Sequence, residues 1–240
     1  MKRKIIFISI LALITLFAFK QSPDEENSNI LSYEVDLKTQ DLKLYWKDEK
    51  GKQFRSFESL KSWLLNKNKE LVFAANGGMY MKNRSPLGLY IENREQITKL
   101  NTRKNAKGNF YLKPNGVFYL KDDNTGGVCV TDKFDSTRVN YATQSGPMLL
   151  IDGEYHPAFN EGSSNLNLRN GVGVLPNGKV LFAMSKTRIN FYDFATYFKT
   201  KGCKNALYLD GYVSRTYLPE KNWKKGDGNF GVIIGVTEKN

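Results

Sequence analysis

The chain has 240 residues, of which 40% are hydrophobic and 25% are charged, and its formal net charge at pH 7 is +12. This is ordinary globular composition, so the core needs no disulfide or metal to hold it together. One histidine and two cysteines exclude a metal site built from several histidines, and the scattered basic residues favour a solvated surface over a specific polyanion site.

Residues 1–20 have the pattern of a targeting signal. A basic run at residues 2–4 precedes an apolar run from Ile5 to Phe19, which has the length of a signal-peptide core and is short for a membrane-spanning helix. We expect cleavage, with an uncleaved anchor that tethers the protein to a membrane as the alternative. The predicted parts are a signal peptide or anchor (1–20), a polar spacer (21–30) and one domain (31–240), placed outside the cytoplasm in the periplasm or the medium.

Apolar runs of strand length alternate with turn residues through the rest of the chain. One helix is predicted from Ser56 to Asn66, with Ser56 as its N-cap, and another from Phe191 to about Lys201, with Asn190 as its N-cap. Single strands are predicted at Tyr33 to Lys38, Leu42 to Trp46, Leu71 to Ala75, Met148 to Ile151, Ala206 to Leu209 and Gly231 to Val236.

Three hairpins are also predicted. They pair Leu87 to Ile91 with Gln96 to Leu100, Phe110 to Lys113 with Val117 to Leu120, and Gly171 to Leu175 with Lys179 to Met184. The last two flank Pro-Asn-Gly sequences at 114–116 and 176–178, which supply the backbone angles of tight turns. Together these elements predict one α+β domain, a mixed and strand-rich sheet domain with two or three helices.

The histidine and the cysteines give weak functional signals. Cys129 and Cys203 could pair in an oxidising compartment, but their spacing alone does not decide this. His156 precedes Pro157 in a polar segment, so we interpret it as a surface turn residue rather than a catalytic one. Asp122 and Asp123 are expected in a turn; no metal ion and no cofactor is predicted for the protein.

Four segments share one form, in which an apolar run leads into a glycine-containing turn with a polar residue. Strand ends hold side chains rigidly, and glycine lets backbone N–H groups approach a ligand. If the four ends converge, they give a pocket with a carboxylate, amides, hydroxyls and a guanidinium. The segments are Ala74 to Tyr80, Gln144 to Met148, Leu168 to Gly173 and Tyr208 to Ser214.

In this order, the motifs N-G-G-x-[YF], S-G-P, R-[TN]-x-[VI]-G-[VI] and L-D-G followed by a serine resemble the phosphodiester glycosidase family. That family includes the enzyme that removes phosphate-linked N-acetylglucosamine to uncover mannose 6-phosphate on lysosomal hydrolases. The resemblance spans about Leu71 to Val236. Longer strings that begin at Pro86, Gly108, Ser145 and Asn190 are similar to its bacterial envelope branch.

Two departures from the family pattern concern the leaving-group side of the pocket more than the hydrolytic chemistry. The family's late aspartate is usually followed by a glycine run and two serines, whereas here Gly211 is followed by Tyr212, Val213 and Ser214. Asn170 also stands where threonine is more usual.

The resemblance implies cleavage of a sugar C–O bond whose leaving group is a phosphodiester. Asp210 is the first candidate for the catalytic carboxylate, with a turn-forming Asp-Gly as the alternative. Asn76 would hold a sugar hydroxyl or the attacking water, with Gly77 and Gly78 bringing backbone donors close. A second carboxylate is expected, for which Asp193 and Glu92 are the candidates; Asp193 also fits a simple helix-capping role.

Other residues are assigned to substrate binding. Arg169 is the preferred phosphate clamp, because a guanidinium grips phosphate at two points, and Arg188 is a weaker second clamp, with Arg215 weaker still. Ser145 and Gly146 would offer a hydroxyl and a backbone N–H to an oxyanion, and Ser214 would line the pocket. Ser145 is not expected to be a nucleophile, since its motif contains no base.

The sequence therefore predicts a hydrolase that cleaves a sugar–phosphate glycosidic bond in a phosphodiester-linked glycan. The alternative is a non-catalytic envelope protein that binds glycan or phosphoglycan. The expected partner is a carbohydrate or phosphoglycan, which a basic surface would suit, and no nucleic acid is expected at an extracytoplasmic address.

Overall fold

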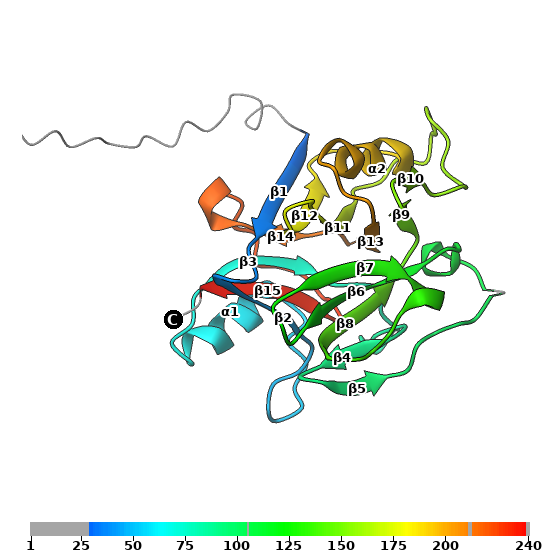
Figure 1. Ribbon diagram of the computed structural model, residues 1–240. Helices are drawn as coiled ribbons and strands as arrows, with labels where there is room; N and C mark the ends of the chain where they lie inside the picture. Colours follow the sequence, from blue (N-terminus) through cyan, green and yellow to red (C-terminus); the bar gives the residue numbers. More distant parts are fainter. Residues whose placement is uncertain (1–28, 105, 211–212, 239–240) are drawn as a thin grey trace, which may run out of the picture.

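The computed structural model of the protein describes residues 29–104, 106–210 and 213–238. Within these ranges three antiparallel sheets and two α-helices form the domain (Figure 1). The strand-rich α+β class predicted from the sequence is confirmed, whereas the predicted signal or anchor segment lies outside the described residues. Across the described part of the chain, no helix combines the length and the apolar character needed to cross a membrane.

The largest sheet has six strands and carries one of the two helices. Helix α2 (Phe191–Thr200) packs against strand β9 of this sheet (Figure 1). The strand order is β1 (Ile30–Val35), β12 (Val180–Ser185), β11 (Asn170–Val174), β13 (Ala206–Asp210), β9 (Met148–Ile151) and β10 (Glu154–Tyr155).

Two smaller sheets complete the fold. Helix α1 (Phe57–Leu65) packs against strand β3 of the four-stranded sheet. That sheet has the order β14 (Thr216–Tyr217), β3 (Leu71–Asn76), β15 (Ile233–Glu238) and β2 (Gln40–Tyr45). The five-stranded sheet has the order β5 (Glu95–Thr98), β4 (Tyr90–Glu92), β8 (Val139–Ser145), β6 (Gly116–Lys121) and β7 (Gly126–Val130).

One buried cluster draws side chains from all three sheets. Phe182 of β12 stacks on Phe73 of β3, with ring centroids 5.1 Å apart, and meets Phe118 of β6 edge-on at 5.8 Å. All three rings are buried. Since burial of one such side chain contributes about 1.5–3 kcal/mol, this shared core holds the three sheets in fixed relative positions. The strand ends that reach the same side of the core are therefore held rigidly.

The two Pro-Asn-Gly sequences behave differently. The turn at 176–178 connects β11 and β12 as predicted. The hairpin predicted around 114–116 is wrong, because residues 109–111 form a 3₁₀ turn and β6 pairs with β7 and β8 instead. Asn115 explains the difference, since its side chain is buried and its Nδ2 donates to the carbonyl oxygen of Phe110 at 2.9 Å. It therefore anchors the loop instead of exposing a turn.

Both predicted helix caps are confirmed. The Ser56 hydroxyl accepts the N–H of Ser59, and the Asn190 side chain accepts the N–H of Asp193. Gly202 follows α2 with a φ of 84°, a left-handed conformation that glycine adopts without strain. These local signals fixed the helix ends correctly because each depends only on neighbouring residues.

The sequence left the pairing of the two cysteines open, and they are not paired; the predicted surface position of His156 is wrong. Cys129, on β7, and Cys203, after α2, are free thiols. His156 is buried and its ring stacks on Phe159, with centroids 4.8 Å apart. Its Nδ1 accepts the N–H of Ala158 at 3.1 Å, and burial lowers the pKa of the imidazole. The polar sequence around His156 hid this packing, because Phe159 stacks in turn on the distant Phe191 of α2.

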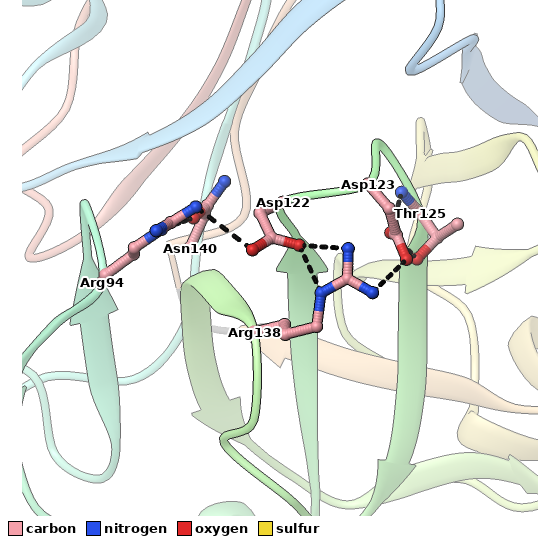
Figure 2. A network of polar contacts seen from close by, with 6 residues as sticks. All are labelled: Arg94, Asp122, Asp123, Thr125, Arg138 and Asn140. Atoms are coloured by element: carbon pink, nitrogen blue, oxygen red, sulfur yellow. Dashed lines mark hydrogen bonds and ion pairs between the residues drawn. The ribbon is translucent and has the colours of Figure 1, made fainter.

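The turn that contains Asp122 and Asp123 is held by arginines (Figure 2). Asp122 accepts from Arg138 Nε at 2.8 Å and from Arg94 Nη2 at 3.1 Å, and Asp123 accepts from the hydroxyl of Thr125. Both oxygen atoms of the Asp122 carboxylate are therefore already paired with arginine side chains. In residues 29–104, 106–210 and 213–238, no group of three or more His, Cys, Asp or Glu side chains is placed to hold a metal ion.

Candidate active site

The side chain of Asn170 joins three strand ends. Its Nδ2 donates to the backbone oxygen and to Oδ1 of Asn76, both at 3.0 Å, which ties the start of β11 to the end of β3. Its Oδ1 accepts the backbone N–H of Asp210 at 2.8 Å, which ties β11 to the end of β13. Asn170 is 1% exposed, so these bonds form out of water, where leaving one unmade is costly. The ends that carry Asn76 and Asp210 therefore converge.

Two serines close the backbone around Asp210. The Ser214 hydroxyl donates to the carbonyl oxygen of Asp210 at 2.6 Å, and the Ser145 hydroxyl, at the end of β8, donates to that of Leu209 at 2.8 Å. Both serines are buried. Ser214 and Ser145 therefore lie at the predicted site, where they position the strand that carries the carboxylate. Gly211 of this motif lies outside the described residues.

Gly77 and Gly78 connect the end of β3 to β8. The carbonyl oxygen of Gly77 accepts the Thr143 hydroxyl at 2.7 Å. Gly78 has a φ of 134°, and a Cβ there would lie 2.9 Å from that hydroxyl oxygen and 3.9 Å from the Cβ of Ser145. Only glycine fits this approach. Gly146, next to Ser145, packs on Asn115, whose Cβ would lie 2.6 Å from a Cβ at that position.

The amide of Asn76 has one donor group left over. Its Oδ1 accepts from Asn170 Nδ2 and from the backbone N–H of Arg215, the latter at 2.9 Å, and these two donors fix the orientation of the amide. Nδ2 is buried and has no hydrogen-bond partner among the described residues. Because buried polar groups are nearly always paired, an unpaired N–H at a strand end suits a ligand oxygen.

The negative charge of the Asp210 side chain acts on two tyrosines. The residue is 8% exposed. Burial raises the pKa of Tyr208 above its usual value, and the negative charge of Asp210 adds to the effect. The pKa of Tyr80 is raised by the same two causes in the same order. The carboxylate is therefore within electrostatic reach of two phenolic hydroxyls, which stay protonated and able to donate.

Arg169 is buried rather than exposed at a pocket wall. Its Nε donates to the carbonyl oxygen of Ile189 at 2.8 Å and its Nη2 to that of Asn165 at 2.7 Å. Nη1 lies 3.5 Å from the Tyr208 hydroxyl, and the guanidinium carbon lies 3.5 Å from the centre of the Phe191 ring. Among the described residues Arg169 has no carboxylate partner within ion-pair distance. This geometry links its positive charge to the site through Tyr208.

The other charged candidates lie elsewhere. Asp193 is exposed and accepts from Asn190 Nδ2 at 2.8 Å, which completes a reciprocal cap at the start of α2. Arg188 is exposed as well. Glu92 lies beside Tyr141 on β8, four residues before Ser145, or about 13 Å along the strand. Asp193 is hydrogen-bonded to Asn190 and Glu92 to the Tyr90 hydroxyl, so both acids have local partners, and Asp210 stays the candidate for the carboxylate of the site.

Sequence reasoning missed three functional contributors. Tyr208 precedes Asp210 by two residues on the same strand, so the alternation of side chains along a strand could have placed both on one face. Tyr80 follows the Asn76-Gly77-Gly78 turn after one residue, Met79. The bridging role of Asn170 had no local signal, because its partners are 94 and 40 residues away in the chain.

The chain matches known proteins over most of its length. Residues 69–237 match the phosphodiester glycosidase family. An uncharacterized Escherichia coli protein, YigE, is 34% identical over 219 residues, which cover 91% of this chain and 85% of that protein.

Three solved structures share the fold at low sequence identity. The zebrafish N-acetylglucosamine-1-phosphodiester alpha-N-acetylglucosaminidase catalytic domain, auto-inhibited by its pro-peptide, matches with a TM-score of 0.56 and 16% identity, over 88% of this chain and 82% of that one. A putative exported protein from Burkholderia pseudomallei matches with a TM-score of 0.55 and 9% identity, over 86% and 73%. A hypothetical protein from Synechocystis matches with a TM-score of 0.54 and 12% identity, over 88% and 59%.

The family match covers all four of the strand-end segments and includes Asn76, Asn170 and Asp210. On the extent of this match and the identity to YigE, the chain belongs to the phosphodiester glycosidase family.

Proposed function

We propose that the protein hydrolyses the bond between a sugar anomeric carbon and a phosphodiester oxygen in a phosphodiester-linked glycan. The observation that carries this proposal is the convergence of Asn76, Asp210 and Ser214 on Asn170, whose side chain fixes the backbone of the buried Asp210 and the amide of Asn76 together. Membership of the phosphodiester glycosidase family supports the same reaction class.

The proposed reaction needs little general acid catalysis from the enzyme. Cleavage of the sugar carbon–oxygen bond releases a phosphate monoester, which leaves as a stable anion, so protonation of the leaving oxygen is less important than in an ordinary glycosidase. The main need is stabilisation of the positive charge that develops on the sugar ring, which the Asp210 carboxylate would supply. Asn76 Nδ2 and the hydroxyls of Tyr80 and Tyr208 would donate to sugar or phosphate oxygens.

Arg169 would stabilise the departing phosphate through its charge. A buried cation normally has an acidic partner, and the lack of one among the described residues favours an anionic ligand in the occupied enzyme. Because its Nε and Nη2 are held by carbonyl oxygens, Arg169 would act mainly through the Tyr208 hydroxyl and through its electrostatic field. This modifies the direct clamp expected from the sequence. Arg188 stays a candidate for a second, exposed contact.

We also propose an address outside the cytoplasm. The basic run and apolar stretch in residues 1–20 support it, with the domain either released or tethered to the membrane. A glycan of the cell envelope or its surroundings is then the accessible substrate.

The experiment that tests the reaction uses an aryl phosphodiester of N-acetylglucosamine in water labelled with ¹⁸O. The proposal expects free sugar that carries the label and aryl phosphate that does not, because the carbon–oxygen bond breaks. Label in the phosphate would show phosphorus–oxygen cleavage and contradict a glycosidase. A screen of other sugar phosphodiesters accompanies it, since the family match does not specify the sugar.

The alternative is a non-catalytic glycan-binding protein, favoured by the loss of the glycine run after Gly211. It predicts saturable binding of a sugar phosphodiester with no release of sugar after prolonged incubation. Binding without turnover across the substrate screen would support this alternative and contradict the hydrolase.

A further inference from the structure

Two neighbouring cavities lie apart from Asp210. The larger, of about 350 Å³, is lined mainly by β2, by the β4–β5 turn and by the β6–β7 turn. The smaller, of about 190 Å³, lies between β2, the end of α1 and β4. Both are lined by Lys43, Asn93 and Tyr141, so the two cavities adjoin; together they are called the groove.

The groove has more positive than negative charge. Its lining includes the cations Lys43, Lys47, Lys67, Lys69, Arg94 and Lys121, and the acids Asp41 and Glu92. Lys43 and Lys69 share the single carboxylate of Asp41, at 2.8 Å and 3.1 Å. Burial acts to raise the pKa of Asp41, but the two lysines outweigh it and the pKa is lowered, so the acid is ionised. The single negative charge of Asp41 therefore pairs with the positive charges of both Lys43 and Lys69.

Two of the lysines have no acidic partner. Lys47 Nζ lies 3.9 Å from the centre of the Trp46 ring, and Lys121 Nζ lies 5.8 Å from that of Tyr119. Among the described residues neither lysine is within ion-pair distance of a carboxylate. Lys121 lines the larger cavity and Lys47 the smaller one. Each part of the groove therefore contains a lysine that has no ion-pair partner among the described residues.

Neutral polar groups line the rest of the groove. Asn93 Oδ1 accepts the hydroxyl of Tyr141, and Arg94 reaches from the β4–β5 turn to Asn140 Oδ1 at 2.8 Å (Figure 2). Gln40, Asn124 and Thr125 add an amide, an amide and a hydroxyl. Amides and hydroxyls of this kind suit the hydroxyl groups of sugars, and the surplus lysines suit carboxylate or phosphate groups.

The aromatic rings in the groove do not suit nucleic acid. Trp63 packs edge-on against Tyr45 and Phe54, with ring centroids 6.0 Å and 5.1 Å apart, and Lys67 Nζ lies over its ring at 4.6 Å. Tyr45 and Tyr141 are buried. Single-stranded nucleic acid is usually bound by free aromatic faces on which bases stack, and these rings are already covered.

We propose that this groove binds an anionic oligosaccharide at a position separate from the site at Asp210. Tyr141 lies on β8 four residues before Ser145, about 13 Å along the strand, so the groove adjoins the same sheet without sharing the site. A charged glycan chain held there would keep the protein on its polymer whether or not hydrolysis occurs, so the proposal does not depend on the proposed reaction.

The test measures binding of a short oligogalacturonate to the full-length protein by calorimetry, at low and at moderate salt. The groove variant carries Lys47→Gln and Lys121→Gln, which break no ion pair. The control variant carries Lys201→Gln and Lys204→Gln, which remove the same charge from the region after α2. Thermal melts check that both variants are folded.

Saturable binding to the wild type that weakens with salt, weakens roughly tenfold further in the groove variant and is unchanged in the control variant would support the proposal. A neutral oligosaccharide of similar length should bind far more weakly. No saturable binding, or equal losses in the two variants, would overturn it. Tighter binding of a single-stranded oligonucleotide with the same loss in the groove variant would identify a nucleic-acid site instead.

Discussion

Asn170 and Asp210 are neighbours on adjacent strands, and the Asn170 side chain accepts the backbone N–H of Asp210 at 2.8 Å. The pairing between β11 and β13 shifts its register at Asn170, so an ordinary ladder bond is replaced there by a side-chain bond. The same amide holds Asn76 through its Nδ2. One side chain thus fixes both the carboxylate and the unpaired amide donor.

Replacing Asn170 with Asp should damage the site more than its small size change suggests. Asp keeps an acceptor for the Asp210 N–H but loses the donor to Asn76 and brings a charge beside two oxygen atoms. We expect unfolding free energy to fall by about 1–3 kcal/mol in chemical denaturation. Asn167→Asp, at an exposed position, is the control and should change stability little. Equal stability in the two variants would argue against the bridging role.

Replacing Arg169 with Lys should lower both the stability of the fold and the rate at which the protein hydrolyses a phosphodiester. An ammonium group cannot reach both carbonyl oxygens with the planar geometry of guanidinium, and it loses the stack on Phe191. We expect kcat/KM to fall at least roughly tenfold, while Arg188→Lys changes it by less than about twofold. The reverse order would assign the phosphate contact to Arg188.

Glu92 should make stability depend on pH. Burial raises the pKa of its carboxyl to about 7, despite the opposing hydrogen bond from Tyr90. The folded protein therefore keeps the proton over a pH range in which the unfolded chain has lost it. The stabilising effect is complete below the unfolded pKa of Glu and is lost as pH rises through about 7.

Denaturation curves at pH 5, 6 and 7 test this dependence, through the difference in unfolding free energy between the wild type and Glu92→Gln. The stability of the wild type should decrease relative to Glu92→Gln as pH rises over this window, whereas Glu70→Gln, which changes an exposed glutamate elsewhere, should follow the wild type. A constant difference between wild type and Glu92→Gln would show that the carboxyl titrates normally.

The free cysteines should leave stability independent of reductant. Burial raises the pKa of both thiols to about 11, so few thiolates are present at neutral pH. We expect the melting temperature to be the same with and without dithiothreitol, and thiol reagents to label both cysteines fully only after denaturation. A lower melting temperature in reductant would instead indicate a disulfide between Cys129 and Cys203, which the sequence left open.

The sequence predicted features that depend on neighbouring residues. The helices at 57–65 and 191–200, with their caps at Ser56 and Asn190, follow from spacing and local side-chain bonds. The four strand ends were recognised because a polar residue and glycine interrupt an apolar run. Their convergence at Asn76, Asn170 and Asp210 was stated only as a condition, because no local signal shows which strand ends meet.

Features set by distant contacts were missed. The loop around Asn115 depends on its bond to Phe110 and on packing against Gly146. His156 stacks on Phe159, which stacks in turn on Phe191 of α2. Arg169 looked like a surface clamp because its sequence neighbours are polar. Its actual partners, such as Ile189 and Phe191, lie about one strand and one turn further along the chain.

The central claim is that Asp210 is the carboxylate of a sugar phosphodiester hydrolase. It is tested most directly by comparing kcat for the N-acetylglucosamine aryl phosphodiester, or for the best substrate of the screen, in Asp210→Asn and Asp193→Asn. Both variants remove one carboxylate, but Asp193 only caps α2. We predict a loss of at least about a thousandfold for Asp210→Asn and near wild-type turnover for Asp193→Asn, with both proteins folded. Full activity in Asp210→Asn would contradict the account.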